Sequence, residues 1–123
     1  MPRRAIPGIG LAALILVAGA SATTPATGLR GTVTLSPTRP VCIEGQPCSK
    51  PASGFVLSFS RNGHVLRRVT TRPDGGYRIV LARGWYAVSF APRQVPRTIA
   101  PTSVRVVAGR MTRVDFEIDT GLR

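Results

Sequence analysis

Beyond residue 28, apolar and polar residues alternate in short segments that are separated by glycine, proline and asparagine. A period of two places alternate side chains on opposite faces of an extended chain, which is typical of half-buried β-strands. No segment repeats its apolar residues at helical spacing. The pattern predicts seven strands. The third strand is His64–Thr71, which pairs with the second. The inward positions of the other six are Leu29, Gly31, Val33 and Leu35; Phe55, Leu57 and Phe59; Tyr77, Ile79 and Leu81; Tyr86, Val88 and Phe90; Val104 and Val106; and Val114, Phe116 and Ile118.

The segments between these strands carry recognisable turn residues. Asn62-Gly63 is a strong hairpin signal, because both central residues of a type I′ turn need positive φ. The adjacent Arg67 and Arg68 interrupt the alternation, which predicts a bulge or an edge position. Residues 91–101 contain three prolines and no regular period, so we expect an extended loop there. Seven such strands predict an all-β, seven-stranded antiparallel β-sandwich.

The first 22 residues have the organisation of a secretory signal peptide. Arg3 and Arg4 precede an apolar stretch from Ile9 to Val17, and small residues follow. We expect a signal peptide helix over residues 1–22, cleavage after Ala22, and a linker over residues 23–28. An uncleaved membrane anchor is the alternative, and it would be the only contact with a membrane. The predicted location is extracytoplasmic, either extracellular or periplasmic.

The two cysteines, Cys42 and Cys48, are separated by five residues that include Gly45 and Pro47. In an oxidising compartment this spacing predicts one disulfide that closes a small loop. A zinc site would need four ligands, and the chain adds only His64. A redox pair would more often be Cys-x-x-Cys at a helix start. We therefore predict no metal site and no cofactor.

The chain is strongly basic, with 17 Lys and Arg residues against 5 Asp and Glu residues and a net charge of +12. Arginines dominate and are spread along the chain, which favours a solvated surface. An Arg-rich surface that binds an anionic envelope polymer or an acidic partner is the alternative. Nucleic acid is not favoured, because most aromatic residues occupy inward positions. The arginines assigned to this surface are Arg67, Arg68, Arg72, Arg78 and Arg83.

Further candidate partner contacts lie in two loops and on one strand. The loops are Cys42–Pro51 and Pro92–Pro101, and the second contains Arg93 and Arg97. Trp85, the only tryptophan, is predicted on the outer face of its strand.

The acidic residues and the histidine do not form a convincing catalytic pattern. Asp115, Glu117 and Asp119 are predicted on one outer face, opposite Arg105 and beside Arg113, which makes them structural charges. Asp119-Thr120-Gly121 matches the aspartic protease triplet, but a second triplet is absent from the sequence, so chance or a structural cap is the better interpretation. His64 follows a turn that would expose it. We predict no catalytic residue.

Two runs of the sequence are similar to a known β-sandwich group. Residues 70–77 (TTRPDGGY) and 81–88 (LARGWYAV) resemble the strand-turn-strand signature of carboxypeptidase regulatory-like domains, within the transthyretin-like (prealbumin-like) group. Gly31-Thr32-Val33, the Ser36–Cys48 loop and the closing residues 119–123 resemble small secreted bacterial proteins of that group. The resemblance covers residues 29–123 and implies an accessory, adhesive or folding module.

Two specialised activities of this group do not match the residues present. Hydroxyisourate hydrolases use several His and Arg residues and a Tyr-Arg-Gly-Ser ending, whereas this chain has one His and ends Gly-Leu-Arg. Adhesin repeats with isopeptide bonds need a Lys and an Asn or Asp on facing strands, but Lys50 and Asn62 are predicted in a loop and a turn. The sequence thus predicts a non-catalytic, secreted or cell-envelope structural or interaction module. Binding of an anionic polymer is the alternative, and an enzyme is the least favoured class.

Overall fold

The computed structural model describes residues 25–94 and 96–122, and these residues form two β-sheets without a helix. The predicted signal peptide and residues 23–24 of the predicted linker lie outside the described residues. No helix that could cross a membrane occurs in the described part of the chain. The strands are β1 (Gly28–Ser36), β2 (Lys50–Pro51), β3 (Val56–Arg61), β4 (His64–Thr70), β5 (Gly76–Val80), β6 (Gly84–Ala91), β7 (Thr98–Ala100), β8 (Ser103–Val106), β9 (Met111–Arg113) and β10 (Phe116–Asp119).

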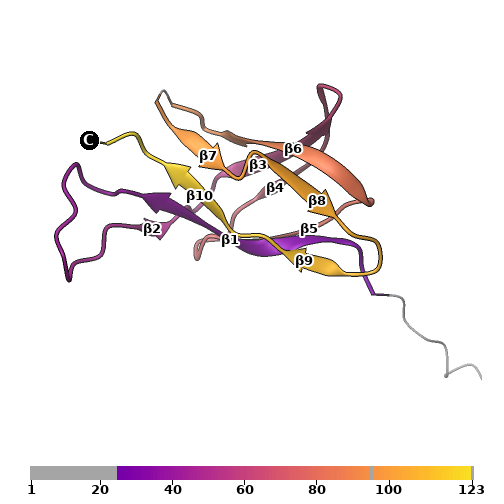
Figure 1. Cartoon of the computed structure of the whole chain (residues 1–123), viewed down its shortest axis with the longest axis horizontal. Helices are drawn as coiled ribbons and strands as arrows, with labels where there is room; N and C mark the ends of the chain where they lie inside the picture. Colours follow the sequence, from indigo (N-terminus) through magenta and orange to yellow (C-terminus); the bar gives the residue numbers. More distant parts are fainter. Residues whose placement is uncertain (1–24, 95, 123) are drawn as a thin grey trace, which may run out of the picture.

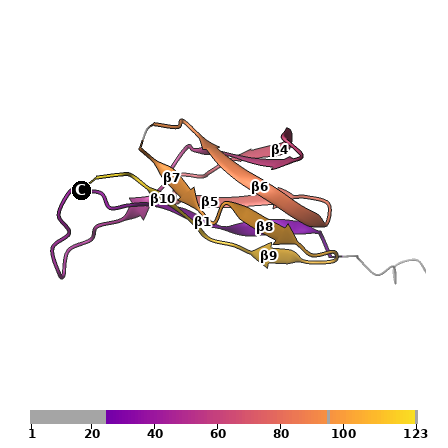
Figure 2. The same ribbon diagram turned by 45° about the horizontal axis from the view of Figure 1, so that its top comes forward.

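One sheet has four strands and the other has six (Figure 1). The four-stranded sheet has the order β4-β3-β6-β8, and all of its neighbours are antiparallel. The six-stranded sheet is organised around β1, which pairs with β2, β5, β9 and β10, and β7 pairs with β10. In Figure 2, β4 and β6 lie above β1 and β5 as two layers. The prediction of an all-β, two-sheet fold is therefore confirmed.

The inward faces of the two sheets meet in a single apolar core. Phe116 lies at its centre, with its ring 5.6 Å from that of Tyr77 and 6.4 Å from that of Phe59. Burying each large apolar side chain contributes about 1.5–3 kcal/mol to folding. The core confirms the predicted inward positions of the fourth and fifth strands. Its members are Leu29, Val33, Leu35, Ala52, Phe55, Leu57, Phe59, Tyr77, Ile79, Leu81, Tyr86, Val88, Phe90, Ile99, Val104, Val106, Phe116 and Ile118.

The predicted hairpin between the second and third strands is present. Asn62 and Gly63 have φ values of 52° and 79°, as a type I′ turn requires. β4 is an edge strand, and the pairing register shifts between Phe59 and Ser60, which leaves Leu66 as the extra residue. The predicted bulge is therefore confirmed, and its extra residue is one position before Arg67 and Arg68. Bulges and inward-facing charges on edge strands oppose pairing with another chain.

The sheets are not purely antiparallel, and seven strands were too few. β1 runs parallel to both β9 and β10 while it pairs antiparallel with β2 and β5. The sequence pattern could not show this, because alternation defines the inward face of a strand and not the direction of its neighbour.

Residues 98–100, expected within a loop, form β7 against β10. Ile99 is the one buried apolar side chain between Pro96 and Pro101, and it is enough to hold a short edge strand.

The predicted last strand is interrupted at Val114 and Asp115. β9 and β10 keep one common register with β1, so Arg30 lies opposite Arg113 and Val33 lies opposite Phe116. Between them, a carboxylate oxygen of Asp115 accepts the backbone N–H of Thr32 at 2.9 Å. A side chain therefore replaces the backbone acceptor at this point, which we call the seam of β1.

Candidate interaction surfaces

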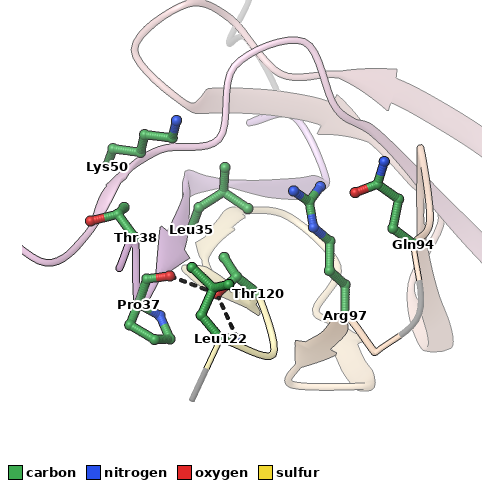
Figure 3. Close-up of a pocket in the computed structure, with 8 residues that line it drawn as sticks. All are labelled: Leu35, Pro37, Thr38, Lys50, Gln94, Arg97, Thr120 and Leu122. Atoms are coloured by element: carbon green, nitrogen blue, oxygen red, sulfur yellow. Dashed lines mark hydrogen bonds between the residues drawn. The ribbon is translucent and has the colours of Figure 1, made fainter. Parts of the chain in front are cut away.

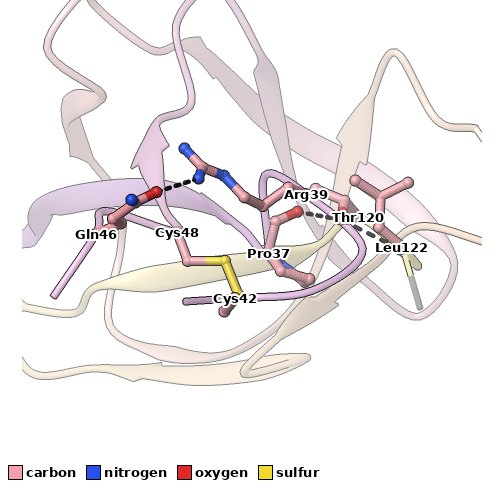
Figure 4. Close-up of a disulfide and its surroundings, with 7 residues drawn as sticks. All are labelled: Pro37, Arg39, Cys42, Gln46, Cys48, Thr120 and Leu122. Atoms are coloured by element: carbon pink, nitrogen blue, oxygen red, sulfur yellow. Dashed lines mark hydrogen bonds between the residues drawn. A yellow bond between two sulfur atoms is a disulfide. The ribbon is translucent and has the colours of Figure 1, made fainter. Parts of the chain in front are cut away.

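Cys42 and Cys48 form the predicted disulfide, which closes a loop between β1 and β2 (Figure 4). The backbone N–H of Thr38 donates to the carbonyl oxygen of Cys48 at 2.9 Å, and the Arg39 guanidinium donates to Oε1 of Gln46 at 2.7 Å. These contacts cross the loop from one arm to the other. The connection between the two strands is therefore cross-linked covalently and by hydrogen bonds, and we call residues 37–49 the disulfide loop.

Two aliphatic side chains are exposed on this loop. Val41 and Ile43 flank Cys42 and are 72% and 53% exposed. Figure 1 places the disulfide loop and the C-terminal segment at one end of the molecule, and the start of the coloured chain before β1 at the other. Apolar side chains that a disulfide holds in water cannot collapse onto the core. They are available to a partner.

The C-terminal segment attaches the base of the disulfide loop to β10. The backbone N–H of Thr120 donates to the carbonyl oxygen of Ser36 at 3.1 Å, and its hydroxyl donates to the carbonyl oxygen of Pro37 at 2.6 Å. The N–H of Gly121 donates to Oδ1 of Asp119 at 2.8 Å. The Asp119-Thr120-Gly121 triplet thus forms a turn that fastens the loop, which agrees with its interpretation as a structural cap.

A basic groove lies beside the disulfide loop (Figure 3). A pocket of about 270 Å³ is lined by Lys50, Gln94 and Arg97, and Leu35 lies between the two cations in this view. An adjoining pocket of about 390 Å³ shares Leu35, Lys50 and Arg97 and extends to Phe55. The Arg97 guanidinium carbon lies 5.9 Å from the centre of the Phe55 ring. None of the described residues that line either pocket is acidic. The groove therefore combines an apolar floor with positively charged walls.

Trp85 is exposed as predicted, with 62% of its surface accessible. It lines an open cleft with Arg83 and Arg105, and Arg105 is its cross-strand partner on β8. The Arg61 guanidinium donates to the carbonyl oxygens of Arg83 at 2.8 Å and Trp85 at 3.2 Å while it stacks over Tyr86. Arg61 therefore supports the backbone beneath the indole.

The other candidate arginines do not gather on one surface. Arg67 and Arg68 lie on the edge strand β4, whereas Arg72 and Arg78 line a cleft on the six-stranded sheet. Arg93 lines a separate cleft of about 180 Å³. Together with Arg83 beside Trp85 and Arg97 in the basic groove, these residues occupy five separate places.

One expected set of ion pairs is wrong in part. Arg113 and Asp115 do pair, at 3.3 Å. Arg105, however, lies opposite Trp85 in the four-stranded sheet, whereas Glu117 and Asp119 lie on β10 in the other sheet. Consecutive strands were expected to be neighbours, but β8 and β10 belong to different layers.

The seam of β1 shifts the pKa values of two residues. The pKa of Asp115 is lowered, mainly by the hydrogen bond from the backbone N–H of Thr32 and further by Arg113. The pKa of Tyr77 is raised, mainly because its phenol is buried and further by the negative charge of Asp115. The Tyr77 hydroxyl donates to the carbonyl oxygen of Val114 at 2.5 Å, so it works as a neutral structural donor.

His64 and Lys50 lie at exposed positions. His64 is the first residue of β4, opposite Arg61 across the hairpin, and Lys50 begins β2 opposite Leu35. In the described residues, no three His, Cys, Asp or Glu side chains come together as metal ligands would.

The sequence-based predictions named single candidate arginines but missed the basic residues that lie beside them in the structure. They named Arg97 among the partner contacts but not Lys50, which lines the same pocket, and they assigned Arg78 to a surface without Arg30. The first relation depends on how the loop before β7 packs beside β2, and the second depends on strand register. The residue pattern contains neither.

No protein-family model matches this chain, and a search of curated proteins found no match. The resemblance to carboxypeptidase regulatory-like domains therefore stays a prediction that rests on the sequence motifs.

Proposed function

We propose that this protein is a non-catalytic, extracytoplasmic interaction module that binds a protein partner through the end formed by the disulfide loop and the basic groove. The observation that carries the proposal is the exposure of Val41 and Ile43 on a cross-linked loop. A loop that is held in one conformation before binding loses less conformational entropy when it binds. Its aliphatic side chains then supply the apolar contact area at the centre of an interface.

The basic groove supports the same choice of surface. Lys50 and Arg97 provide cations within reach of a ligand that lies over Leu35 and Phe55. This arrangement favours a partner segment with an apolar side chain and a nearby carboxylate. The apolar part supplies affinity, and the charge pair sets orientation and association rate.

The disulfide supports an extracytoplasmic location, since such bonds persist mainly in oxidising compartments. A non-catalytic role is supported by the positions of the reactive groups. His64 lies opposite Arg61 on an edge strand, and the Asp119 carboxylate accepts the backbone N–H of Gly121 in the turn that fastens the loop.

Site-specific photo-crosslinking in the exporting cell tests this function. A photoreactive residue at position 41 or 43 is expected to crosslink one discrete partner, whereas the same residue at position 65 or 66 is not. Val65 and Leu66 are a matched control, because they are also exposed aliphatic residues, at 42% and 49%, but lie on β4. The double variant Val41→Ser, Ile43→Ser should abolish partner recovery, and Val65→Ser, Leu66→Ser should preserve it.

Equal crosslinking from both pairs of positions would contradict the proposal. So would partner recovery that is the same for the two double variants. Circular dichroism of each purified variant controls for folding, and all four substitutions are at exposed sites.

A further inference from the structure

Three arginines lie side by side on adjacent strands of the six-stranded sheet. Arg30 on β1 is directly opposite Arg78 on the antiparallel strand β5. On the other side, Arg30 is directly opposite Arg113 on the parallel strand β9. Adjacent strands are about 4.8 Å apart, so the three side chains start within about 10 Å of one another. We call Arg30, Arg78 and Arg113 the arginine row.

The arginine row faces the outer surface of the sheet. Leu29 and Ile79, which neighbour Arg30 and Arg78 along their strands, are opposite one another and buried in the core. Alternation therefore directs the arginines away from the core. With Arg72 they line a cleft of about 240 Å³.

The charges of this cleft are only partly compensated. Arg113 pairs with Asp115 at 3.3 Å and Arg72 pairs with Asp74 at 3.8 Å. Within the described part of the chain, neither Arg30 nor Arg78 forms an ion pair. Like charges directly opposite one another destabilise a sheet. The central pair of the row therefore opposes folding unless an anion lies between the two guanidinium groups.

We propose that the arginine row binds a tetrahedral oxyanion, namely a phosphate or sulfate group. Guanidinium groups donate paired hydrogen bonds to such oxygens. A carboxylate has two oxygens and one charge, and a single arginine can use both oxygens. A phosphate or sulfate group carries one or two charges on tetrahedrally arranged oxygens, so different oxygens can accept from Arg30 and from Arg78, the two arginines that lack an acidic partner.

This site goes beyond the proposed function, because it lies on the half of β1 that does not carry the disulfide loop. The two proposals fail separately. Loss of the oxyanion site would leave the crosslinking of Val41 and Ile43 unchanged.

Thermal unfolding of the disulfide-bonded protein tests the site. Inorganic phosphate at millimolar concentration, compared with chloride at equal ionic strength, should raise the Tm by about 5 °C. The variant Arg78→Gln should unfold at a higher Tm than the unchanged protein in chloride, because it relieves the repulsion. It should also lose most of the increment produced by phosphate. Arg68→Gln, which removes the same charge from β4, is the matched control and should keep the full increment.

This pair of variants separates a bound anion from the general stabilisation that phosphate gives many proteins, since the general effect acts equally on both. An equal phosphate increment in Arg78→Gln and Arg68→Gln would overturn the proposal. An Arg78→Gln variant that is less stable than the unchanged protein in chloride would also contradict the proposal. Arg78 would then stabilise the folded protein without a bound anion, and repulsion between Arg30 and Arg78 would not be the dominant effect.

Two polymers identify the source of the group. If the phosphate group belongs to a polymer, Arg78→Gln should weaken binding of a glycerol phosphate polymer at least tenfold. If the ligand is a free ion, the same variant should weaken binding of inorganic phosphate and leave binding of the polymer unchanged. Binding to polyglutamate of equal charge should change little. An equally large loss with polyglutamate would show that the surface responds to charge alone and would exclude a tetrahedral oxyanion site.

Discussion

The two halves of strand β1 carry opposite kinds of surface on the same sheet. In the first half, Arg30 lies between Arg78 and Arg113, so three basic side chains are neighbours. In the second half, Thr34 lies opposite Glu117, and Ser36 lies opposite Asp119. The first half ends in a basic cleft, whereas the second leads into the cross-linked disulfide loop. A single strand therefore serves two surfaces because its partners change along its length.

The seam between these halves shows how the change of partner is accommodated. Thr32 lies where β9 gives way to β10, and its backbone N–H would lose an acceptor there. The Asp115 carboxylate supplies that acceptor and also pairs with Arg113. The carboxylate that accepts this N–H thus lies between Arg113 of the arginine row and Glu117 on β10.

The largest expected effect comes from filling the space at the seam. A Cβ on Gly31 would overlap the carbonyl oxygen of Val114 and lie 2.7 Å from Oδ1 of Asp115. Gly31→Ala should therefore lower the free energy of unfolding by about 3 kcal/mol or more, because backbone must move. Chemical denaturation measures the change. Gly109→Ala is the matched control, since its φ is also positive but its Cβ would meet nothing within 4 Å, and its cost should be near 1 kcal/mol. Equal costs at the two glycines would mean that the two halves of β1 do not depend on a close approach at the seam.

Removing the disulfide should lower the stability of the whole domain, but it should loosen locally only the second half of β1, which leads into the disulfide loop. The double variant Cys42→Ser, Cys48→Ser should lower the free energy of unfolding by about 2.4 kcal/mol, which is the chain-entropy value for a seven-residue ring. Partner crosslinking from position 43 should also fall, because the loop is no longer held in one conformation. Hydrogen exchange of the backbone N–H groups of residues 28–32 in native conditions checks the comparison. Their exchange rates should increase only as much as the lower global free energy of unfolding predicts. A selective loss of protection in that first half would contradict the separation.

The smallest expected effect is a pH dependence at the seam. The pKa of Asp115 is lowered in the folded protein by the Thr32 N–H, so its contribution to stability is present above the unfolded pKa of about 3.9. That contribution is lost as the pH falls through the folded value, because protonation removes the charge that the N–H stabilises. Asp115 is largely exposed, and solvent screening limits the effect to less than about 1 kcal/mol. Asp115→Asn should reduce the loss of stability between pH 5 and pH 2 (about the range over which carboxylates titrate). NMR titration of the carboxyl carbon should find its pKa below that of an unfolded reference, and a value at or above the reference would refute the role of the seam.

Residues with clear local signals were predicted correctly. Tyr77, Ile79 and Leu81 occupy every second position and are all buried, and Asn62-Gly63 forms the hairpin turn that its sequence requires. The exposed Trp85 and the disulfide were also predicted from position and spacing. These features depend on neighbouring residues or on cysteine chemistry, so the sequence contains them directly.

The errors have a common physical origin. Residues 98–100 have one buried apolar side chain, which is too little for a period of two to be visible. Arg105 was predicted to lie opposite the acidic residues of the last strand, but β8 and β10 lie in different sheets. Arg30 lies opposite Arg78, and Lys50 lines the same pocket as Arg97, although the members of these two sets are 48 and 47 positions apart along the chain.

The amino-acid sequence by itself determined most of the longer strands, the inward faces of those strands, the Asn62-Gly63 turn and the disulfide, because each follows from local backbone preference, the period of the apolar residues or cysteine chemistry. The tertiary structure alone decided which strands became neighbours, and in which direction. That choice created the seam, the basic groove and the arginine row. The physical reason is that register and strand order depend on the packing of the whole core, so the surface assembled from distant residues exists only once that core has formed.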